Sequence, residues 1–199
     1  MRALRGIVPI VLLLSSVACG GARRAPRQRV LLPPTLNLVP HHNIGLFQFS
    51  VENAKGTLHE FATRRFEEYV LAAQTGIEMR EYRQADSARV FTDSTGVPVA
   101  FFGHLKISNV KPSGGLTAGL SPNVQATVTV ELSVWLVNIR TGGVMWRRSS
   151  TSTEKVGGLS FLGGTPSFSA RDPNDAYGQL VNRLVYAVTY DVRSTWVDQ

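Results

Sequence analysis

The sequence predicts an α/β (α+β) sandwich, in which helices pack on a mixed sheet of about five strands in the chain order β-α-β-β-β-β-α. Three patterns support this prediction. Apolar residues repeat at helical spacing between Thr57 and Gly76, and they do so again after Asp172. Between these segments, apolar and polar residues alternate from Asn123 to Ile139, as in a strand with one buried face. One domain, residues 44–199, accounts for all three patterns.

The first half of the domain predicts a strand, a helix and a second strand. Residues 44–51 contain closely spaced apolar side chains and predict a buried strand. Thr57 and Glu60 have the spacing of a capping box at the start of a helix. Gly76 ends that helix, and a right-handed crossover then places a short strand, 77–82, parallel to the first. The buried face of the helix is predicted to comprise Leu58, Phe61, Ala62, Phe66, Tyr69, Val70 and Ala73.

Three further strands are predicted to form an antiparallel meander. The first is 99–110, and the second is the alternating segment 123–139. A glycine turn at 140–143 leads into the third, 144–155, whose serines and threonines suit a half-exposed sheet edge. Trp135 lies near the end of the second strand, where both faces become apolar, and we therefore expect a helix to cover that half of the sheet.

The last predicted element is a long amphipathic helix. Asp172 is a suitable N-cap, and Pro173 occupies the first helical position. We interpret the apolar stripe as core packing, and no cofactor is expected. The stripe comprises Tyr177, Leu180, Val181, Leu184, Val185, Val188, Val192 and Trp196.

The N-terminus has the features of a bacterial lipoprotein signal. Arg2 and Arg5 form a basic region, an apolar run follows, and Val17-Ala18-Cys19 provides a small-residue cleavage site. We expect residues 1–18 to be removed and the single cysteine, Cys19, to carry acyl chains that hold the protein on a membrane. Gly20 favours the outer membrane by known sorting rules, with the domain in the periplasm. The alternative is an ordinary signal peptide followed by a coincidental cysteine.

Residues 19–43 predict a tether, because four prolines interrupt any regular structure there. Removing Arg2 and Arg5 lowers the formal charge from +7 to +5, and four arginines of the tether account for most of the remainder: Arg23, Arg24, Arg27 and Arg29. We interpret this cluster as a solvated basic linker that can favour an anionic membrane. An exported chain meets little nucleic acid, so nucleic acid is not an expected partner despite the high pI.

The pattern of reactive residues does not predict an enzyme. There is no G-x-S-x-G motif, and the one cysteine is assigned to lipid. His41 and His42 are adjacent but lie in the predicted tether, whereas His59 and His104 have no motif partner, so no metal site is expected. Paired acids such as Glu67 and Glu68 have an ordinary explanation on a solvated helix face.

Two glycine-containing loops are the most suggestive segments for binding. In an antiparallel meander, the loop before Asn123 and the loop after Val156 emerge at the same end of the sheet. Apolar side chains on such loops indicate contact with a partner or a membrane. The alternative is that they fold back and cap the core. The candidate partner-binding residues are Leu116, Leu120, Leu159, Phe161 and Leu162.

Two segments, 97–105 and 130–146, resemble envelope lipoproteins of the peptidoglycan-synthase activator (LpoB) and curli secretion (CsgG) type, with an α/β domain similar to the TolB N-terminal domain. They read VPVAFFGHL and VELSVWLVNIRTGGVMW. The resemblance implies a non-enzymatic interaction or assembly module of the cell envelope, whose partner is an envelope protein or peptidoglycan. The alternative is an oligomeric subunit of a curli-type secretion complex. Neither glycine loop is long enough for the two membrane-crossing strands of a pore.

Overall fold

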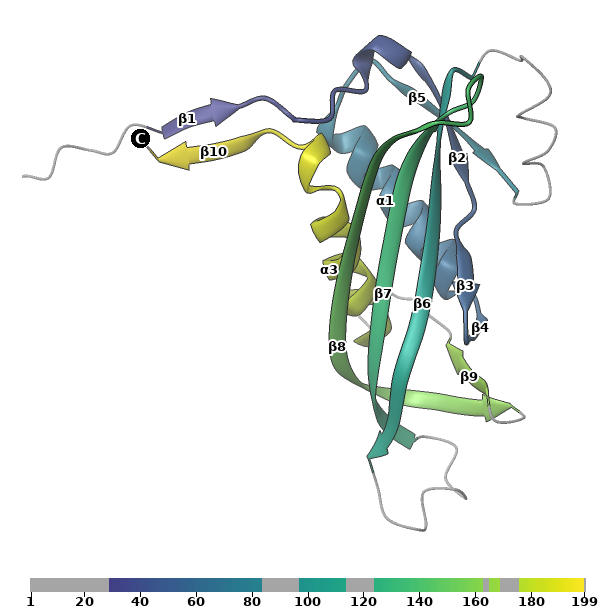
Figure 1. Cartoon of the computed structure of the whole chain (residues 1–199). Helices are drawn as coiled ribbons and strands as arrows, with labels where there is room; N and C mark the ends of the chain where they lie inside the picture. Colours follow the sequence, from purple (N-terminus) through teal and green to yellow (C-terminus); the bar gives the residue numbers. More distant parts are fainter. Residues whose placement is uncertain (1–28, 84–96, 114–123, 163–164, 169–175, 199) are drawn as a thin grey trace, which may run out of the picture.

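The computed structural model describes residues 29–83, 97–113, 124–162, 165–168 and 176–198. Within them, eight strands form one mixed sheet, and two helices pack on it, which confirms the predicted fold class. The strand order is β4-β9-β8-β7-β6-β2-β5, and β3 pairs with β6 beside this series. A separate two-stranded ribbon projects from one end (Figure 1).

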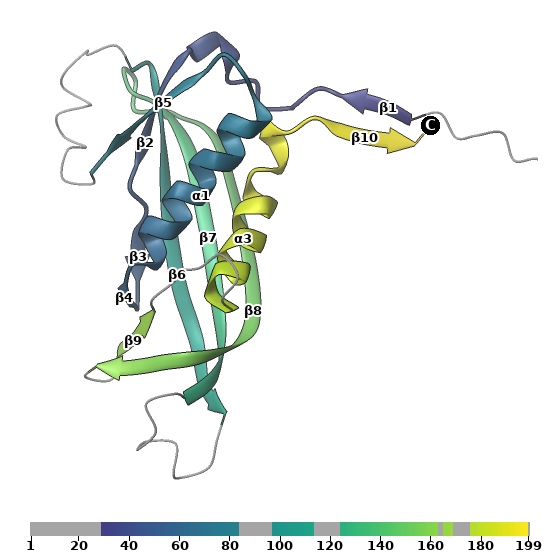
Figure 2. The ribbon, with the colours of Figure 1, turned by 180° about the vertical axis from the view of Figure 1, so that it is seen from behind.

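Both helices lie on the same face of the sheet. They are α1 (Leu58–Ala73) and α3 (Ala176–Val188), and Figure 2 shows them side by side in front of the strands. Their apolar faces and one face of the sheet share a continuous buried core that includes Phe66, Phe101 and Leu184. Trp135 lies on the opposite face, so the expectation that a helix covers its half of the sheet is wrong for the described helices.

The parallel half of the sheet follows the prediction. β2 (Asn43–Phe47) pairs in parallel with β5 (Glu78–Tyr82) on one side and with β6 (Val99–Ser113) on the other. The predicted first strand is interrupted after Phe47 and resumes as β3 (Ser50–Glu52). Thr57 is the N-cap of α1 as predicted, but its side chain makes no capping hydrogen bond.

Phe49 and Gly103 explain the interruption between β2 and β3. Phe49 is buried in the core, and a Cβ atom at Gly103 would lie 2.4 Å from its ring. Atoms cannot approach so closely, and only glycine leaves room for the phenyl ring over β6. Thr63 on α1 accepts the Phe49 backbone N–H through its hydroxyl oxygen at 2.9 Å, which holds the segment in place.

The antiparallel meander is longer than predicted. β6 pairs with β7 (Val124–Asn138), which pairs with β8 (Val144–Leu162). β8 then pairs with β9 (Thr165–Phe168), which is joined in parallel by β4 (Lys55–Gly56). The prediction of a loop after Val156 is therefore wrong up to Leu162. Glycines at 157 and 158 do not end the strand, because its backbone continues to pair with both neighbours.

Ordered packing also begins earlier than the predicted boundary at Ile44. β1 (Arg29–Leu32) pairs antiparallel with β10 (Thr195–Asp198), and a 3₁₀ helix, η1 (Val39–His41), precedes β2. Leu38 is fully buried in the core. The described part of the expected tether, 29–43, is thus attached to the domain, because apolar residues between the prolines reach the core.

The C-terminal helix is shorter than predicted. α3 ends at Val188 and is followed by a 3₁₀ turn, η4 (Tyr190–Val192), and by β10. The Thr189 hydroxyl donates to the Val185 carbonyl at 2.7 Å, and Arg193 donates to the Tyr186 carbonyl at 2.6 Å. These side chains satisfy the last carbonyl groups and end the helix. Trp196 therefore lies on a strand, and its assignment to the helical stripe is wrong.

Candidate functional site

The face of the sheet opposite α1 and α3 is the main candidate site, and we call it the open face. Successive residues of a strand point to opposite sides. On β6, Phe101 and Leu105 enter the core beneath the helices, whereas Phe102, His104 and Lys106 lie on the open face. The open face therefore consists of residues that alternate with the core along the same strands.

One end of the open face carries stacked aromatic rings. Phe47 lies between Tyr82 and Phe102, with ring centroids 5.4 Å and 4.4 Å away, and Phe102 is 6.3 Å from Trp135. We call these four residues the aromatic row. It crosses four neighbouring strands, β5, β2, β6 and β7. Phe47 is only 1% exposed, whereas the other three side chains are half-buried, so the row offers partial ring surface to solvent.

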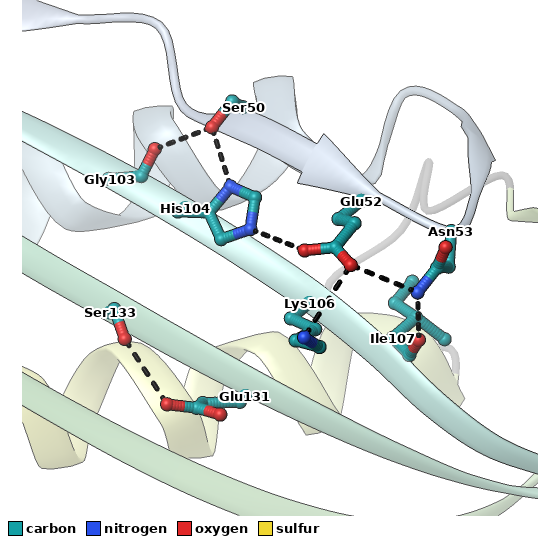
Figure 3. A network of polar contacts seen from close by, with 9 residues as sticks. All are labelled: Ser50, Glu52, Asn53, Gly103, His104, Lys106, Ile107, Glu131 and Ser133. Carbon is teal, nitrogen blue, oxygen red and sulfur yellow. Dashed lines mark hydrogen bonds and ion pairs between the residues drawn. The ribbon is translucent and has the colours of Figure 1, made fainter.

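A polar network lies farther along the same face, and we define it as Ser50, Glu52, His104 and Lys106 (Figure 3). The Ser50 hydroxyl is 2.8 Å from Nδ1 of His104, whose Nε2 is 3.2 Å from the Glu52 carboxylate. Lys106 Nζ approaches the other Glu52 oxygen at 3.5 Å. Parallel pairing of β3 with β6 places Ser50 opposite His104 and Glu52 opposite Lys106, which brings the four side chains together.

The contacts of the network stabilise the ionised form of Glu52. The pKa of Glu52 is lowered chiefly by its hydrogen bond with His104, with a further contribution from Lys106. A neutral His104 that donates from Nε2 to the carboxylate leaves Nδ1 to accept the Ser50 O–H. The network is thus a polarised chain of groups that can offer a cation, an anion and hydroxyl groups to a ligand.

Hydroxyl groups extend this polar surface across β7 and β8. Thr129 and Thr153 are 2.9 Å apart through their hydroxyl oxygens, and Ser133 and Ser149 are 2.7 Å apart. The Ser133 hydroxyl also donates to Glu131 at 3.3 Å (Figure 3). Each pair joins neighbouring strands. The open face is consequently hydrogen-bonding and mixed in charge from the network to β8.

The order serine, histidine, carboxylate also occurs in nucleophilic hydrolases. Acyl transfer further requires donors aimed at a developing oxyanion. A second acceptor for the single Ser50 hydroxyl proton, the backbone carbonyl of Gly103, lies 3.4 Å from the hydroxyl oxygen. The observed contacts are those of a cross-strand polar network.

Metal-binding clusters and membrane-spanning helices are two further features that bear on function in the described ranges. No group of three or more histidine, cysteine or acidic side chains in them is placed to hold a metal ion. Neither described helix has the length and apolar character needed to cross a bilayer.

The predicted partner-binding residues are only partly placed. Leu116 and Leu120, like Cys19, lie outside the described residues. Leu159, Phe161 and Leu162 lie on β8 rather than in a loop. The structure describes their backbone and not their side chains. Their role in binding stays a prediction.

Sequence reasoning missed the open face as a site. The alternation through 99–107 contained its signal, because Phe102, His104 and Lys106 occupy every second position. Ser50 and Glu52 could not be paired with them from sequence, since the register of a parallel strand pair depends on the crossover rather than on a turn.

The architecture, a single helical layer on a mixed sheet, is shared with solved bacterial proteins. No protein-family model matches the chain, and no curated protein sequence matches it. The PelC dodecamer from Paraburkholderia phytofirmans aligns with a TM-score of 0.50 and 12% identity, covering 82% of this chain and 96% of PelC. A variant of the same protein, also a dodecamer, gives 0.52 and 11%, covering 83% and 97%.

The lipoprotein GNA1162 from Neisseria meningitidis is a more distant structural neighbour. It aligns with a TM-score of 0.38 and 13% identity over 57% of this chain and 83% of its own. The similarity to PelC defines the fold of this chain. The finer resemblance to the LpoB and CsgG types stays a prediction.

Proposed function

We propose that this protein is a lipid-anchored module of the bacterial cell envelope that binds a partner through the open face and catalyses no reaction. Cys19 carries the lipid, the anchor lies in the outer membrane, and the domain faces the periplasm. The partner is an envelope protein or peptidoglycan, and the module activates or scaffolds a cell-wall or export machine.

The observation that carries this proposal is the contrast in what covers the two sides of the sheet. α1 and α3 both cover one side, whereas the open face combines half-buried aromatic rings with the polar network. Aromatic residues beside satisfied polar groups are typical of binding surfaces. The network needs no partner for its own hydrogen bonds, and it can therefore remain in water until one binds.

Crosslinking in the native envelope tests the use of the open face. A photoreactive amino acid at Lys106 or Thr151, both exposed there, is expected to capture the partner in cells that produce the full chain. Arg64 and Leu71 are exposed on α1 and provide matched control positions. Crosslinks from the control positions alone would overturn the proposal.

A second candidate function is an oligomeric subunit of a curli-type secretion or envelope assembly complex. The specific observation in its favour is that PelC, which has this fold, is a dodecamer. Light scattering of the purified mature chain separates the two. A ring-sized particle supports assembly and directs attention to the predicted contacts Leu116, Leu120, Leu159, Phe161 and Leu162. A monomer supports the docking module.

A further inference from the structure

The two-stranded ribbon formed by β1 and β10 is separate from the sheet that carries the open face, and the proposed function gives it no role. Its four residue pairs run from Arg29 opposite Asp198 to Leu32 opposite Thr195. No third strand joins it within the described residues, and it extends away from the sheet (Figures 1 and 2). An isolated two-stranded ribbon is marginally stable in water. Contacts beyond the pairing of β1 with β10 are therefore needed to stabilise the ribbon.

The ribbon exposes large apolar side chains. Leu31 and Trp196 are directly paired, so they share a face, and they are 48% and 63% exposed. Arg29 and Asp198 lie on that same face and form an ion pair at 3.1 Å. Leu32, on the other face, is 46% exposed. Leu31 and Trp196 therefore form one exposed apolar pair on this face of the ribbon.

The base of the ribbon is held firmly by the domain. Gln74, at the end of α1, accepts the Leu38 N–H at 2.7 Å and donates to the carbonyls of Leu36 and Val192 at 2.6 Å and 3.0 Å. The Leu36 N–H donates to the Asp191 carbonyl at 2.8 Å. One amide thus joins the segment after β1, the end of α1 and the segment before β10 at the base of the ribbon.

The preceding chain indicates what the ribbon meets. Ten peptide bonds separate Arg29 from Cys19, and they span at most about 35 Å when fully extended. The residues between them include Arg23, Arg24 and Arg27 and no acid. Each arginine beside an anionic bilayer contributes about 1 kcal/mol to membrane attraction. If Cys19 carries lipid, the ribbon is the described element closest along the chain to the membrane.

We propose that the β1–β10 ribbon docks on the membrane surface, with the Leu31 and Trp196 side chains in the interfacial region of the bilayer. Tryptophan is favoured at that depth, and Arg29 can reach back to the headgroups along its aliphatic stem. The domain is then held in a fixed orientation rather than free on its tether. This inference rests on the lipidation proposed for Cys19.

Flotation of the mature chain, residues 19–199 with Cys19→Ser, tests the docking without the lipid. We expect it to float with vesicles of phosphatidylethanolamine, phosphatidylglycerol and cardiolipin and to float at least fivefold less with phosphatidylcholine alone. The double variant Leu31→Ser/Trp196→Ser is expected to lose at least fivefold of the binding to anionic vesicles. Equal flotation of the variant and its parent would overturn the proposal.

Val144 and Met145 supply the matched control. They are 60% and 50% exposed at the start of β8, outside the ribbon. Their double serine variant is expected to float like the parent. The circular dichroism spectrum of each variant must match that of the parent, so that a change in flotation does not reflect unfolding. If light scattering shows that the ribbon variant loses an oligomer while its flotation is unchanged, the ribbon binds a second copy of the chain instead.

Mass spectrometry of the protein extracted from membranes keeps the two proposals distinguishable. Acyl chains on Cys19 support the anchor. An unmodified cysteine would contradict the anchor, whereas the vesicle measurements would still report on the ribbon by itself.

Discussion

The covered face and the open face of the sheet are built from alternate residues of the same strands, yet they are different kinds of surface. On β6, Phe101 is completely buried against Phe66 and Trp146, whereas its neighbour Phe102 is half-buried beside Trp135. The covered face consists largely of apolar side chains, and the open face mixes rings with charges. The difference separates the positions that encode stability from those between them, to which we assign recognition in the proposed function.

The largest expected effect is on the covered face. Phe101→Ala removes a ring that is fully buried, and it is expected to lower the free energy of unfolding by about 3–5 kcal/mol. Urea unfolding followed by circular dichroism measures it. Lys106→Ala, five positions later on the open face, is the control and should change stability by less than about 0.5 kcal/mol. Equal losses would show that the two faces do not differ in this way.

The next effect is at the buried junction beneath the ribbon. Gln74→Leu leaves the Leu38 N–H and two carbonyls without their partner, and we expect a loss of about 3 kcal/mol. Hydrogen exchange should rise in β1 and β10 more than in the sheet. Gln48→Leu is a control at a half-buried glutamine. A uniform rise in exchange would mean that Gln74 supports the whole domain rather than this junction.

A smaller, pH-dependent effect is expected at Asp191. Burial disfavours the charge of this carboxylate, but hydrogen bonds from Arg148 and Trp146, at 2.6 Å and 3.0 Å, outweigh it and lower the pKa. A lowered folded-state pKa stabilises the protein above the unfolded value, 3.8, and the contribution disappears as the pH falls through the folded value. Asp191→Asn should therefore cost about 1–2 kcal/mol at pH 7 and less at pH 3. A pH-independent cost in urea titrations would contradict this account.

The smallest effect on stability is expected in the polar network, where the effect on binding is largest. His104→Ala removes the contacts to Ser50 and Glu52 on a partly exposed surface, so the unfolding midpoint should hardly change. Crosslinking from Thr151 should fall severalfold. Thr57→Ala, at the uncapped start of α1, is the control for an equally mild substitution. Unchanged crosslinking would remove the network from the binding surface.

Ser50 provides a test of the non-enzymatic proposal. Because its hydroxyl belongs to a cross-strand network, we expect no covalent labelling of the native protein by a fluorophosphonate probe. A serine hydrolase of known activity serves as the positive control. Labelling that disappears in Ser50→Ala would show that the serine is an activated nucleophile.

The sequence predicted the elements that depend on local periodicity. The helical spacing of Leu58, Phe66 and Val70 and the alternation through β7 each place their residues correctly in the core. Element ends were predicted less well. β8 continues through two glycines, because backbone pairing with β7 and β9 outweighs their weak strand preference.

The candidate sites depend on contacts between residues distant in the chain, and sequence patterns did not predict those contacts. Trp196 fits a helical stripe by spacing, but the Thr189 and Arg193 side chains end α3 before it. The partner of β10 is β1, at the far end of the described chain. Glu52 and His104 likewise meet only through the register of β3 on β6.

The pairing of Arg29 with Asp198 constrains the order in which the described elements fold. The two residues are 169 positions apart, so β1 can pair with β10 only after every strand of the sheet has been synthesised. Contacts between residues so distant in the chain form slowly, because closing a long loop costs conformational entropy. Closure of the ribbon is therefore a late event in folding, and a molecule with an open ribbon can already hold a folded sheet.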